Sequence, residues 1–174
     1  MDILDYVIRK LKGSFRCAKE QGMVVGKNVS VMGGVDFGSE PYLITLHDNC
    51  RISTNVTFIN HDGGTWAFRN DNERYKSVVK YGTIEVGEYT FIGANSTIMP
   101  GVKIGDHCVI GACSLVNKDV PNGTIVGGVP AKFICATKDY AERCLKNMPE
   151  DFDEDAYFKD KKKYLIEHYM RKKE

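Results

Sequence analysis

The sequence has no long apolar segment and no excess of charge of either sign. Its apolar runs span only a few residues, far fewer than the roughly 20 that a membrane-spanning helix needs. The amino terminus alternates charged and aliphatic residues, whereas a signal peptide would be continuously apolar. The 24 Lys and Arg residues nearly balance the 23 Asp and Glu residues, so charge does not favour nucleic acid as a partner. We therefore expect a cytoplasmic protein without a membrane span.

The six cysteines show no metal-binding or disulfide pattern. They include no CxxC pair and have no histidine at the spacing of a zinc site. Cys50 and Cys108 occupy positions of the repeat described next that require a small buried side chain, and free cysteine packs well there. Disulfides are rare in reducing compartments. We therefore expect free cysteines and no metal site.

A period of six residues runs without a slip from Val86 to Pro121. An aliphatic residue opens every unit, Gly follows it in four of the six units, and the fifth residue is small or β-branched. The opening residues are Val86, Ile92, Ile98, Ile104, Ile110 and Val116. This period fits neither an amphipathic helix nor a long alternating strand, so it predicts a repeat architecture.

The repeat predicts how the chain coils. Each unit is too short to bury its own aliphatic residue, but three short parallel strands with a turn about every sixth residue form one triangular coil. Stacked coils then align the aliphatic residues in a continuous core. We expect the glycine after each aliphatic residue to relieve the tight corner by adopting a φ angle that other residues resist. The sequence thus predicts a mainly β fold, a parallel β-helix of roughly four to five coils.

The same period begins at Val25 and is interrupted twice. The first break, around Pro41, displaces the register because proline cannot continue a strand. The second runs from His61 to about Gly82 and contains Trp66, the only tryptophan. Its apolar content is sufficient for packing, so we expect an ordered arm. Insertions in a repeat fold commonly form its binding face.

A chain of 174 residues is long enough for one domain with a small appendage. We assign residues 1–24 to a helix over 2–12 with a lead-in. Residues 25–134 form the repeat domain with its loop at 61–83, and residues 135–174 form a helical extension. The first helix is amphipathic and should cover an open end of the repeat. Further helices are expected over 137–147 and 154–172, with Pro149 between them.

The run IGANSTIMPGVKIGDHCVIGACSLVNKDVPNGTIVGGVPAK resembles the acetyl-CoA-dependent hexapeptide-repeat acyltransferases. This group includes maltose and galactoside O-acetyltransferases, xenobiotic acetyltransferases and sugar acetyltransferases of surface polysaccharide synthesis. The similarity covers about residues 25–134. The end of the run, VNKDVPNGTIVGGVPAK, is highly specific for this family. The resemblance implies a left-handed β-helix, an exception to the right-handed crossover rule, and a homotrimer with active sites between subunits. It also implies acetyl transfer from acetyl-CoA, without a metal, to a small saccharide acceptor.

Among the four histidines, the position of His61 resembles that of the family's catalytic histidine. It stands in FINHDGG, where the repeat stops and the long loop begins. Its neutral imidazole could deprotonate a hydroxyl while that oxygen attacks the acetyl carbonyl, without a covalent acyl-enzyme. His47, His107 and His168 are expected to be structural or solvated.

The resemblance also implies a set of coenzyme A contacts. They are Phe91, Gly93, Ala94, Gly111, Ala112, Asn117, Lys118 and Lys132. By similarity, Ala94 is a candidate oxyanion donor and Lys132 matches a basic residue near the nucleotide phosphates. Asn117 stands where relatives commonly have Thr, and Lys132 where they usually have Arg, so both depart from the common pattern.

The acceptor contacts are expected in the two interruptions, which offer aromatic faces and charged hydrogen-bond partners of the kind that sugar binding uses. They are Glu40, Tyr42, Trp66 and Arg69. Alternatively, Trp66 only anchors the loop. N-acetylation of a nucleotide-linked amino sugar is the alternative reaction, and a non-catalytic β-helix scaffold is a further alternative. A γ-type carbonic anhydrase is excluded because it needs three histidine ligands, two of them closely spaced.

Overall fold

The computed structural model describes residues 13–170. The expected helix over 2–12 lies outside these residues, as do the last two residues of the helix expected over 154–172. The chain divides after Thr137 into two compact units, which are described separately below.

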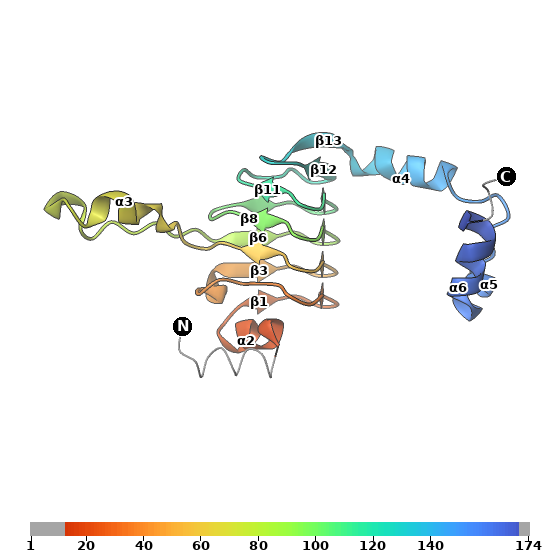
Figure 1. The fold of residues 1–174 in the computed structure, drawn as a ribbon, viewed down its shortest axis with the longest axis horizontal. Helices are drawn as coiled ribbons and strands as arrows, with labels where there is room; N and C mark the ends of the chain where they lie inside the picture. Colours follow the sequence, from red (N-terminus) through yellow and green to blue (C-terminus); the bar gives the residue numbers. More distant parts are fainter. Residues whose placement is uncertain (1–12, 171–174) are drawn as a thin grey trace. The chain divides into compact units, whose positions relative to one another are not determined.

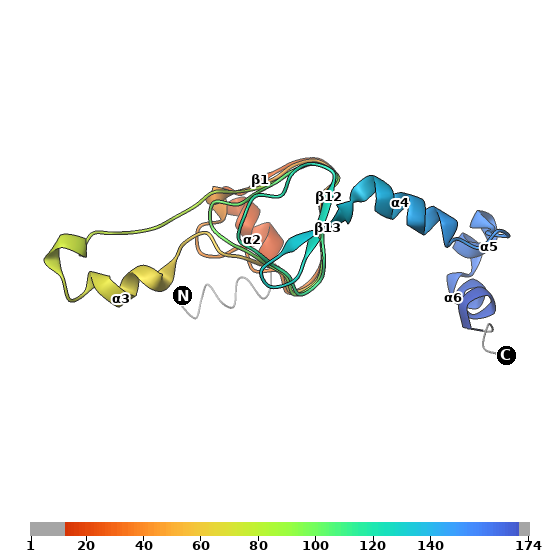
Figure 2. The same cartoon turned by 90° about the horizontal axis from the view of Figure 1, so that it is seen from above.

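The first unit is a β-helix of three sheets, A, B and C, which the chain visits in turn (Figures 1 and 2). Sheet A contains β1 (Val24–Val25), β3 (Ile44–Leu46), β6 (Ile84–Val86) and β9 (Lys103–Ile104). Sheet B contains β2 (Ser30–Val31), β4 (Arg51–Ile52), β7 (Phe91–Ile92), β10 (Val109–Ile110), β12 (Thr124–Gly127) and β13 (Lys132–Ala136). Sheet C contains β5 (Thr57–Phe58), β8 (Thr97–Ile98) and β11 (Leu115–Val116). The named strands pair in parallel except β12 and β13, which are antiparallel. The predicted parallel β-helix is confirmed.

The core is the column of aliphatic residues that the period predicted. Each of the six residues that open a unit between Val86 and Val116 is at most 1% exposed. The register places Ile92 between Ile52 and Ile110 on neighbouring strands, so side chains from successive coils stack directly. Full burial of one such side chain stabilises the fold by about 1.5–3 kcal/mol. Stacking of the coils therefore supplies the apolar burial that a single six-residue unit cannot provide.

The glycines after the aliphatic residues have a different purpose from the predicted one. None of Gly87, Gly93, Gly105 and Gly111 has a positive φ angle, so the prediction that they relieve the corner through φ was wrong. A Cβ added to Gly93 would lie 2.5 Å from the backbone nitrogen of Ala112 in the next coil. Left-handed φ angles at non-glycine corners occur at Asn28, Asn49, Asn55, Tyr89, Asn95, His107 and Cys113. Glycine is thus needed where the coils approach as closely as they do at Gly93, and asparagine, which tolerates positive φ, forms most of these corners.

Both interruptions leave the β-helix where the chain passes from sheet C to sheet A, here named the C–A corner. The first contains the 3-10 helix Pro41–Leu43 and leads into β3. The second follows β5 and contains the 3-10 helices Gly63–Thr65 and Glu73–Tyr75 and the short helix α3 (Trp66–Arg69). Figures 1 and 2 show this second interruption projecting from the coils as an arm. At its base, the Asp62 amide donates to the Lys80 carbonyl oxygen over 2.8 Å.

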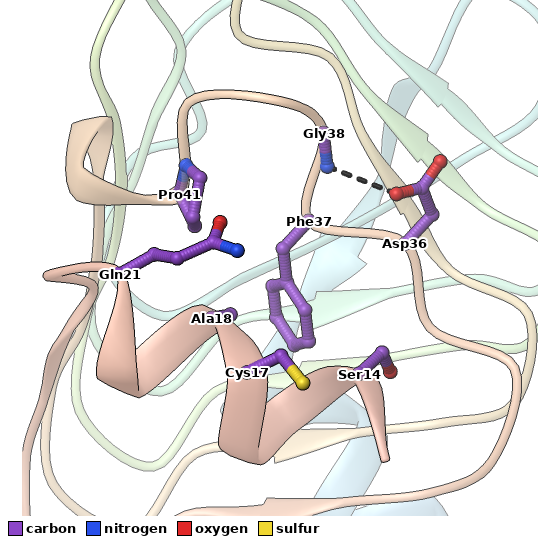
Figure 3. Close-up of a pocket in the computed structure, with 8 residues that line it drawn as sticks. All are labelled: Ser14, Cys17, Ala18, Gln21, Asp36, Phe37, Gly38 and Pro41. Carbon is purple, nitrogen blue, oxygen red and sulfur yellow. Dashed lines mark hydrogen bonds between the residues drawn. The ribbon is translucent and has the colours of Figure 1, made fainter. Parts of the chain in front are cut away.

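A helix that was not predicted, α2 (Ser14–Glu20), covers one end of the β-helix. Seven residues are too few to show a clear helical period. Its buried Cys17 and Ala18 face Phe37, whose ring stacks on that of Phe58 at a centroid distance of 5.4 Å. Figure 3 shows Phe37 and Pro41 turned toward this helix. The helix thereby covers the apolar residues of the first coil.

The second unit follows Thr137. Helix α4 (Thr137–Lys146) leads into it, followed by α5 (Glu154–Lys159), α6 (Lys161–Leu165) and a π-helical turn (Ile166–Met170). The single helix expected over 154–172 is interrupted at Asp160, whose carboxylate accepts a hydrogen bond from the Lys163 amide over 3.0 Å and caps α6. Within the described residues, no helix is long and apolar enough to cross a membrane.

All six cysteines are free. Cys50 and Cys108 are buried, as their repeat positions predicted, and burial raises the pKa of the Cys50 thiol to about 11. Cys113 and Cys144, which do not occupy these positions, are exposed.

Candidate active site

His61 forms a close contact with a carboxylate from the other interruption. Its Nδ1 lies 2.9 Å from Oε2 of Glu40. A carboxylate accepts hydrogen bonds and cannot donate them, so this bond requires a proton on Nδ1; in the neutral imidazole, Nε2 then carries the lone pair. The Ser39 hydroxyl also donates to Glu40 Oε2, over 3.0 Å. The His61 side chain is 47% exposed and that of Glu40 16%, so the pair faces solvent on the imidazole side.

The fold explains why residues 21 positions apart meet. Glu40 and His61 each follow the last core aromatic residue of a coil, Phe37 and Phe58, and both segments leave at the C–A corner. Phe37 and Phe58 stack in successive coils, so the two interruptions emerge next to each other. The sequence prediction placed Glu40 among the acceptor contacts, whereas the structure places its carboxylate on the imidazole.

A cavity opens between His61 and the base of the arm. Its lining includes the side chains of His61, Trp66, Arg69, Lys80 and Tyr81. The Tyr81 ring centroid lies 6.0 Å from that of His61, and the Trp66 side chain, which is 69% exposed, lines the same cavity. Lys80 and Tyr81 were not predicted, because they reach His61 only when the arm turns back and Tyr81 pairs with His61 in an antiparallel bridge.

An ion pair secures the base of the arm. Lys80 Nζ lies 2.9 Å from Asp62 Oδ2. The hydrogen bond from Lys80, followed by the one from the Gly64 amide, holds the pKa of the Asp62 carboxyl below its usual value. Asp62 therefore remains an anion that holds the two ends of the arm together.

A second histidine and carboxylate pair provides a comparison on a different face. His47 Nε2 lies 2.9 Å from Glu85 Oε1, and Lys103 Nζ lies 3.1 Å from the other oxygen of Glu85. The Lys103 contact, then that of His47, keeps the pKa of Glu85 below its usual value. Glu85 lies on β6 of sheet A and His47 follows β3 of the same sheet, and neither residue lines the cavity beside His61.

Four of the predicted coenzyme contacts meet at a different corner, where the chain passes from sheet B to sheet C, here named the B–C corner. Gly93 and Ala94 follow β7, and Gly111 and Ala112 follow β10 in the next coil. The Gly93 amide donates to the Ile110 carbonyl oxygen over 2.8 Å. The amide of Ala94, in contrast, donates no hydrogen bond within residues 13–170. These four small residues form a strip along the corner, in which Gly93 is buried and Ala112 is exposed. The free Ala94 amide is a donor that suits a carbonyl oxygen of a bound thioester.

The remaining predicted site residues lie in three places. Phe91 and Lys132 are on sheet B, where Lys132 pairs with Gly127. Asn117 and Lys118 follow β11 and are exposed at the C–A corner, in a later coil than His61. Tyr42 is exposed, and its Cβ lies close to Gly22 at the end of α2. It does not line the cavity beside His61.

The site has no metal-binding cluster. Among residues 13–170, no group of three His, Cys, Asp or Glu side chains is placed to hold a metal ion.

Comparisons with known proteins agree with this architecture. Residues 83–118 match the family model described as bacterial transferase hexapeptide (six repeats). The chain is 41% identical over 133 residues to Protein CapG of Staphylococcus aureus, an alignment that covers 76% of this chain and 74% of that protein. It is 33% identical over 129 residues to the galactoside O-acetyltransferase of Escherichia coli strain K12, covering 71% of this chain and 53% of that one.

A solved structure supports the same relationship. The crystal structure of a hexapeptide-repeat acetyltransferase of Vibrio cholerae O1 biovar eltor, complexed with acetyl coenzyme A, aligns with a TM-score of 0.55 at 27% identity. The alignment covers 66% of this chain and 60% of that chain. Together with the CapG match, this confirms the resemblance found in the repeat. The chain therefore belongs to the acetyl-CoA-dependent hexapeptide-repeat acyltransferase family.

Proposed function

We propose that the protein transfers the acetyl group of acetyl-CoA to a hydroxyl of a saccharide, with His61 as the general base. The observation that carries this proposal is the 2.9 Å contact between His61 Nδ1 and Glu40 Oε2 beside the aromatic cavity. A base that is oriented by a carboxylate and open to solvent on its other nitrogen can take a proton from a bound hydroxyl.

The residues divide the reaction between them. Bound acetyl-CoA supplies an activated thioester. His61 Nε2 takes the hydroxyl proton as that oxygen attacks the acetyl carbonyl, and the imidazolium then returns the proton to the departing thiolate. Glu40 holds the ring and balances the charge of the imidazolium. The free amide of Ala94 is the candidate donor to the oxyanion that develops on the carbonyl.

The cavity supports a saccharide as the acceptor. The exposed Trp66 ring offers an apolar face against which a sugar ring can stack, and Arg69 supplies hydrogen-bond donors. We propose that these two residues, with Tyr81, hold the acceptor so that one hydroxyl faces His61.

The two separate corners support an active site between subunits. Within one chain, His61 lies at the C–A corner and Ala94 at the B–C corner, so they are on different edges of the triangular coil. In a closed ring of three copies, the B–C corner of one copy can face the C–A corner of the next. We therefore propose a homotrimer of left-handed coils in which one copy supplies His61 and its neighbour holds the coenzyme.

Thiol release from acetyl-CoA, measured against a panel of sugars, amino sugars and small amines, tests the function. His61→Ala should lower turnover of the best acceptor by about 10²–10⁴-fold, the range typical of a general base. His47→Ala is the matched control, because that imidazole is similarly exposed and also bonds a carboxylate over 2.9 Å. Near-normal turnover of folded His61→Ala would contradict the assignment.

The same panel decides between the alternatives. Turnover only with amines, among them nucleotide-linked amino sugars, would replace O-acetylation by N-acetylation. Absence of acetyl-CoA binding in calorimetry would favour a scaffold.

A mixing experiment tests the shared site. Ala112→Trp, which would block the strip at the B–C corner, and His61→Ala should each be inactive alone. Their mixed trimers should regain activity, since some of their sites combine an intact His61 with an intact corner. Mixing without recovery in a confirmed heterotrimer would contradict a site formed between subunits.

A further inference from the structure

The residue before the proposed base, Asn60, is fully buried and bonded to the segment that carries Glu40. Its Nδ2 donates to the carbonyl oxygens of Phe37 and Glu40, each over 3.1 Å. We propose that Asn60 is a positioning residue that fixes the first interruption so that the Glu40 carboxylate stays on His61 Nδ1. This inference rests on the proposed role of His61 as the general base.

The partners of Asn60 determine the orientation of its amide. Two carbonyl oxygens face one end of the amide, and carbonyls only accept, so the nitrogen must lie at that end. Oδ1 then points away, and it accepts no hydrogen bond from any part of the chain that the structure describes. A buried acceptor without a donor is costly, and an apolar side chain would avoid that cost. The two hydrogen bonds from Asn60 Nδ2 to the carbonyl oxygens of Phe37 and Glu40 therefore explain why a polar side chain stands at this position.

Gly38 makes room for this arrangement. A Cβ on Gly38 would overlap Asn60 Oδ1, and the φ angle of Gly38 is +69°. The Gly38 amide donates to Asp36 Oδ1 over 3.0 Å, a bond drawn in Figure 3. The same view shows the segment from Asp36 to Pro41 arching over α2, with Phe37 turned toward the helix. The segment is thus held by the helix on one side and by Asn60 on the other.

Asn60 also connects this segment to the arm. Its backbone oxygen accepts a hydrogen bond from the Gly82 amide over 2.9 Å, at the point where the arm returns to the coils. Asn60 therefore bonds both the backbone of the segment that carries Glu40 and the backbone where the arm returns. Displacement of a catalytic group by about 1 Å can lower the rate by about 100-fold, so loss of this contact should slow the chemical step.

Asn60→Asp tests the inference with a side chain of nearly the same size. It replaces the amide donors by a carboxylate oxygen, which the carbonyls of Phe37 and Glu40 cannot satisfy. We expect kcat to fall about 100-fold while the KM for acetyl-CoA is unchanged, since four of the predicted coenzyme contacts lie at the B–C corner. Asn49→Asp is the control, because Asn49 bonds Asn28 at a corner away from His61, and it should keep wild-type kcat.

A double-mutant cycle separates positioning from general structural support. If Asn60 acts through the Glu40 carboxylate, Asn60→Ala should lower kcat strongly in the wild type and only slightly in a Glu40→Ala background. A merely structural role would lower kcat by the same factor in both backgrounds, which would overturn the inference.

A spectroscopic readout does not depend on turnover. In ¹⁵N NMR of the wild type, the His61 proton should reside on Nδ1, and folded Asn60→Asp should show a mixture of tautomers. An unchanged tautomer would overturn the proposal for Asn60. An active His61→Ala variant would instead overturn the proposed function and leave this measurement valid.

A second pair of variants keeps the proposal testable if Asn60→Asp does not fold. Gly38 and Gly34 both have positive φ angles, and a Cβ on either would overlap an asparagine Oδ1, that of Asn60 or that of Asn55. Gly38→Ala should lower kcat about 100-fold, whereas Gly34→Ala should retain it at comparable stability. Equal kcat in the two variants would overturn the positioning role.

Discussion

Two glycines at equivalent repeat positions should respond in opposite ways to the same substitution. Gly87 and Gly111 each follow a core aliphatic residue, and neither has a positive φ angle. A Cβ on Gly87 would lie 2.5 Å from the carbonyl carbon of Gly105 and 2.6 Å from the Asp106 nitrogen, both backbone atoms of the next coil. A Cβ on Gly111 would meet nothing closer than 3.5 Å. We therefore expect Gly87→Ala to destabilise the protein and Gly111→Ala to stabilise it.

The magnitudes follow from the two environments. Overpacking against atoms that cannot rotate away costs about 1–3 kcal/mol, so Gly87→Ala should lose that much. Gly111→Ala meets only ordinary van der Waals contacts and restricts the unfolded chain, which should gain about 0.4–1 kcal/mol. Each kcal/mol should move the midpoint of thermal unfolding by about 2–4 °C in a protein of this size.

Circular dichroism during urea and thermal unfolding, at one protein concentration for all variants, measures the difference. Gly101→Ala is a useful third variant, because Gly101 has a φ angle of +84° and an added Cβ would meet no atom within 4 Å. It should lose about 1–2 kcal/mol through backbone strain alone. If Gly87→Ala proved as stable as Gly111→Ala, the account of glycine as a requirement of close coil stacking would be refuted.

Three further predictions concern the core and the ionisable groups. Ile98→Ala, at a side chain that is 0% exposed, should lower the free energy of unfolding by about 2–5 kcal/mol in urea titrations; a loss below about 1 kcal/mol would contradict the stacked core. Because burial raises the pKa of the Cys50 thiol from 9.0 to about 11, the folded state favours the protonated thiol. The contribution of the Cys50 thiol to the free energy of unfolding should be fully present below pH 9 and be lost as the pH rises toward 11. In Cys50→Ala, unfolding curves should give a free energy of unfolding that depends less on pH over this range. Lys103 and then His47 lower the pKa of Glu85, so Lys103→Met should raise it in ¹³C NMR titrations. The stabilisation from Glu85 is lost as the pH falls through its folded-state pKa. If Lys103→Met left the ¹³C titration of the Glu85 carboxyl unchanged, the ion pair with Lys103 would be ruled out.

The repeat itself could be predicted because its signal is local. An aliphatic residue at every sixth position needs burial, and only stacked coils bury all of these residues at once, so the core could be named from residues such as Ile92 and Ile110. The interruptions could be located for the same reason, since each breaks the period. His61 could be chosen because it stands at such a break and resembles the family's catalytic position.

Features that depend on the spacing between coils could not be predicted. The purpose of Gly93 was misjudged because the sequence does not give the distance from its Cα to the Ala112 nitrogen in the next coil. The helix predicted over 154–172 was too long. Asp160 can occur within a helix, and the sequence does not show that its side chain instead caps the start of α6.

The sequence by itself determined the coiled architecture, the core and the family, since all three depend on residue types at fixed spacing along the chain. Only the tertiary structure decided that Glu40 lies on His61, because both interruptions leave neighbouring coils at the same corner. It also placed Asn60 against the carbonyl oxygens of Phe37 and Glu40. Contacts between insertions depend on which corner each one leaves, and that position is fixed only when the coils stack.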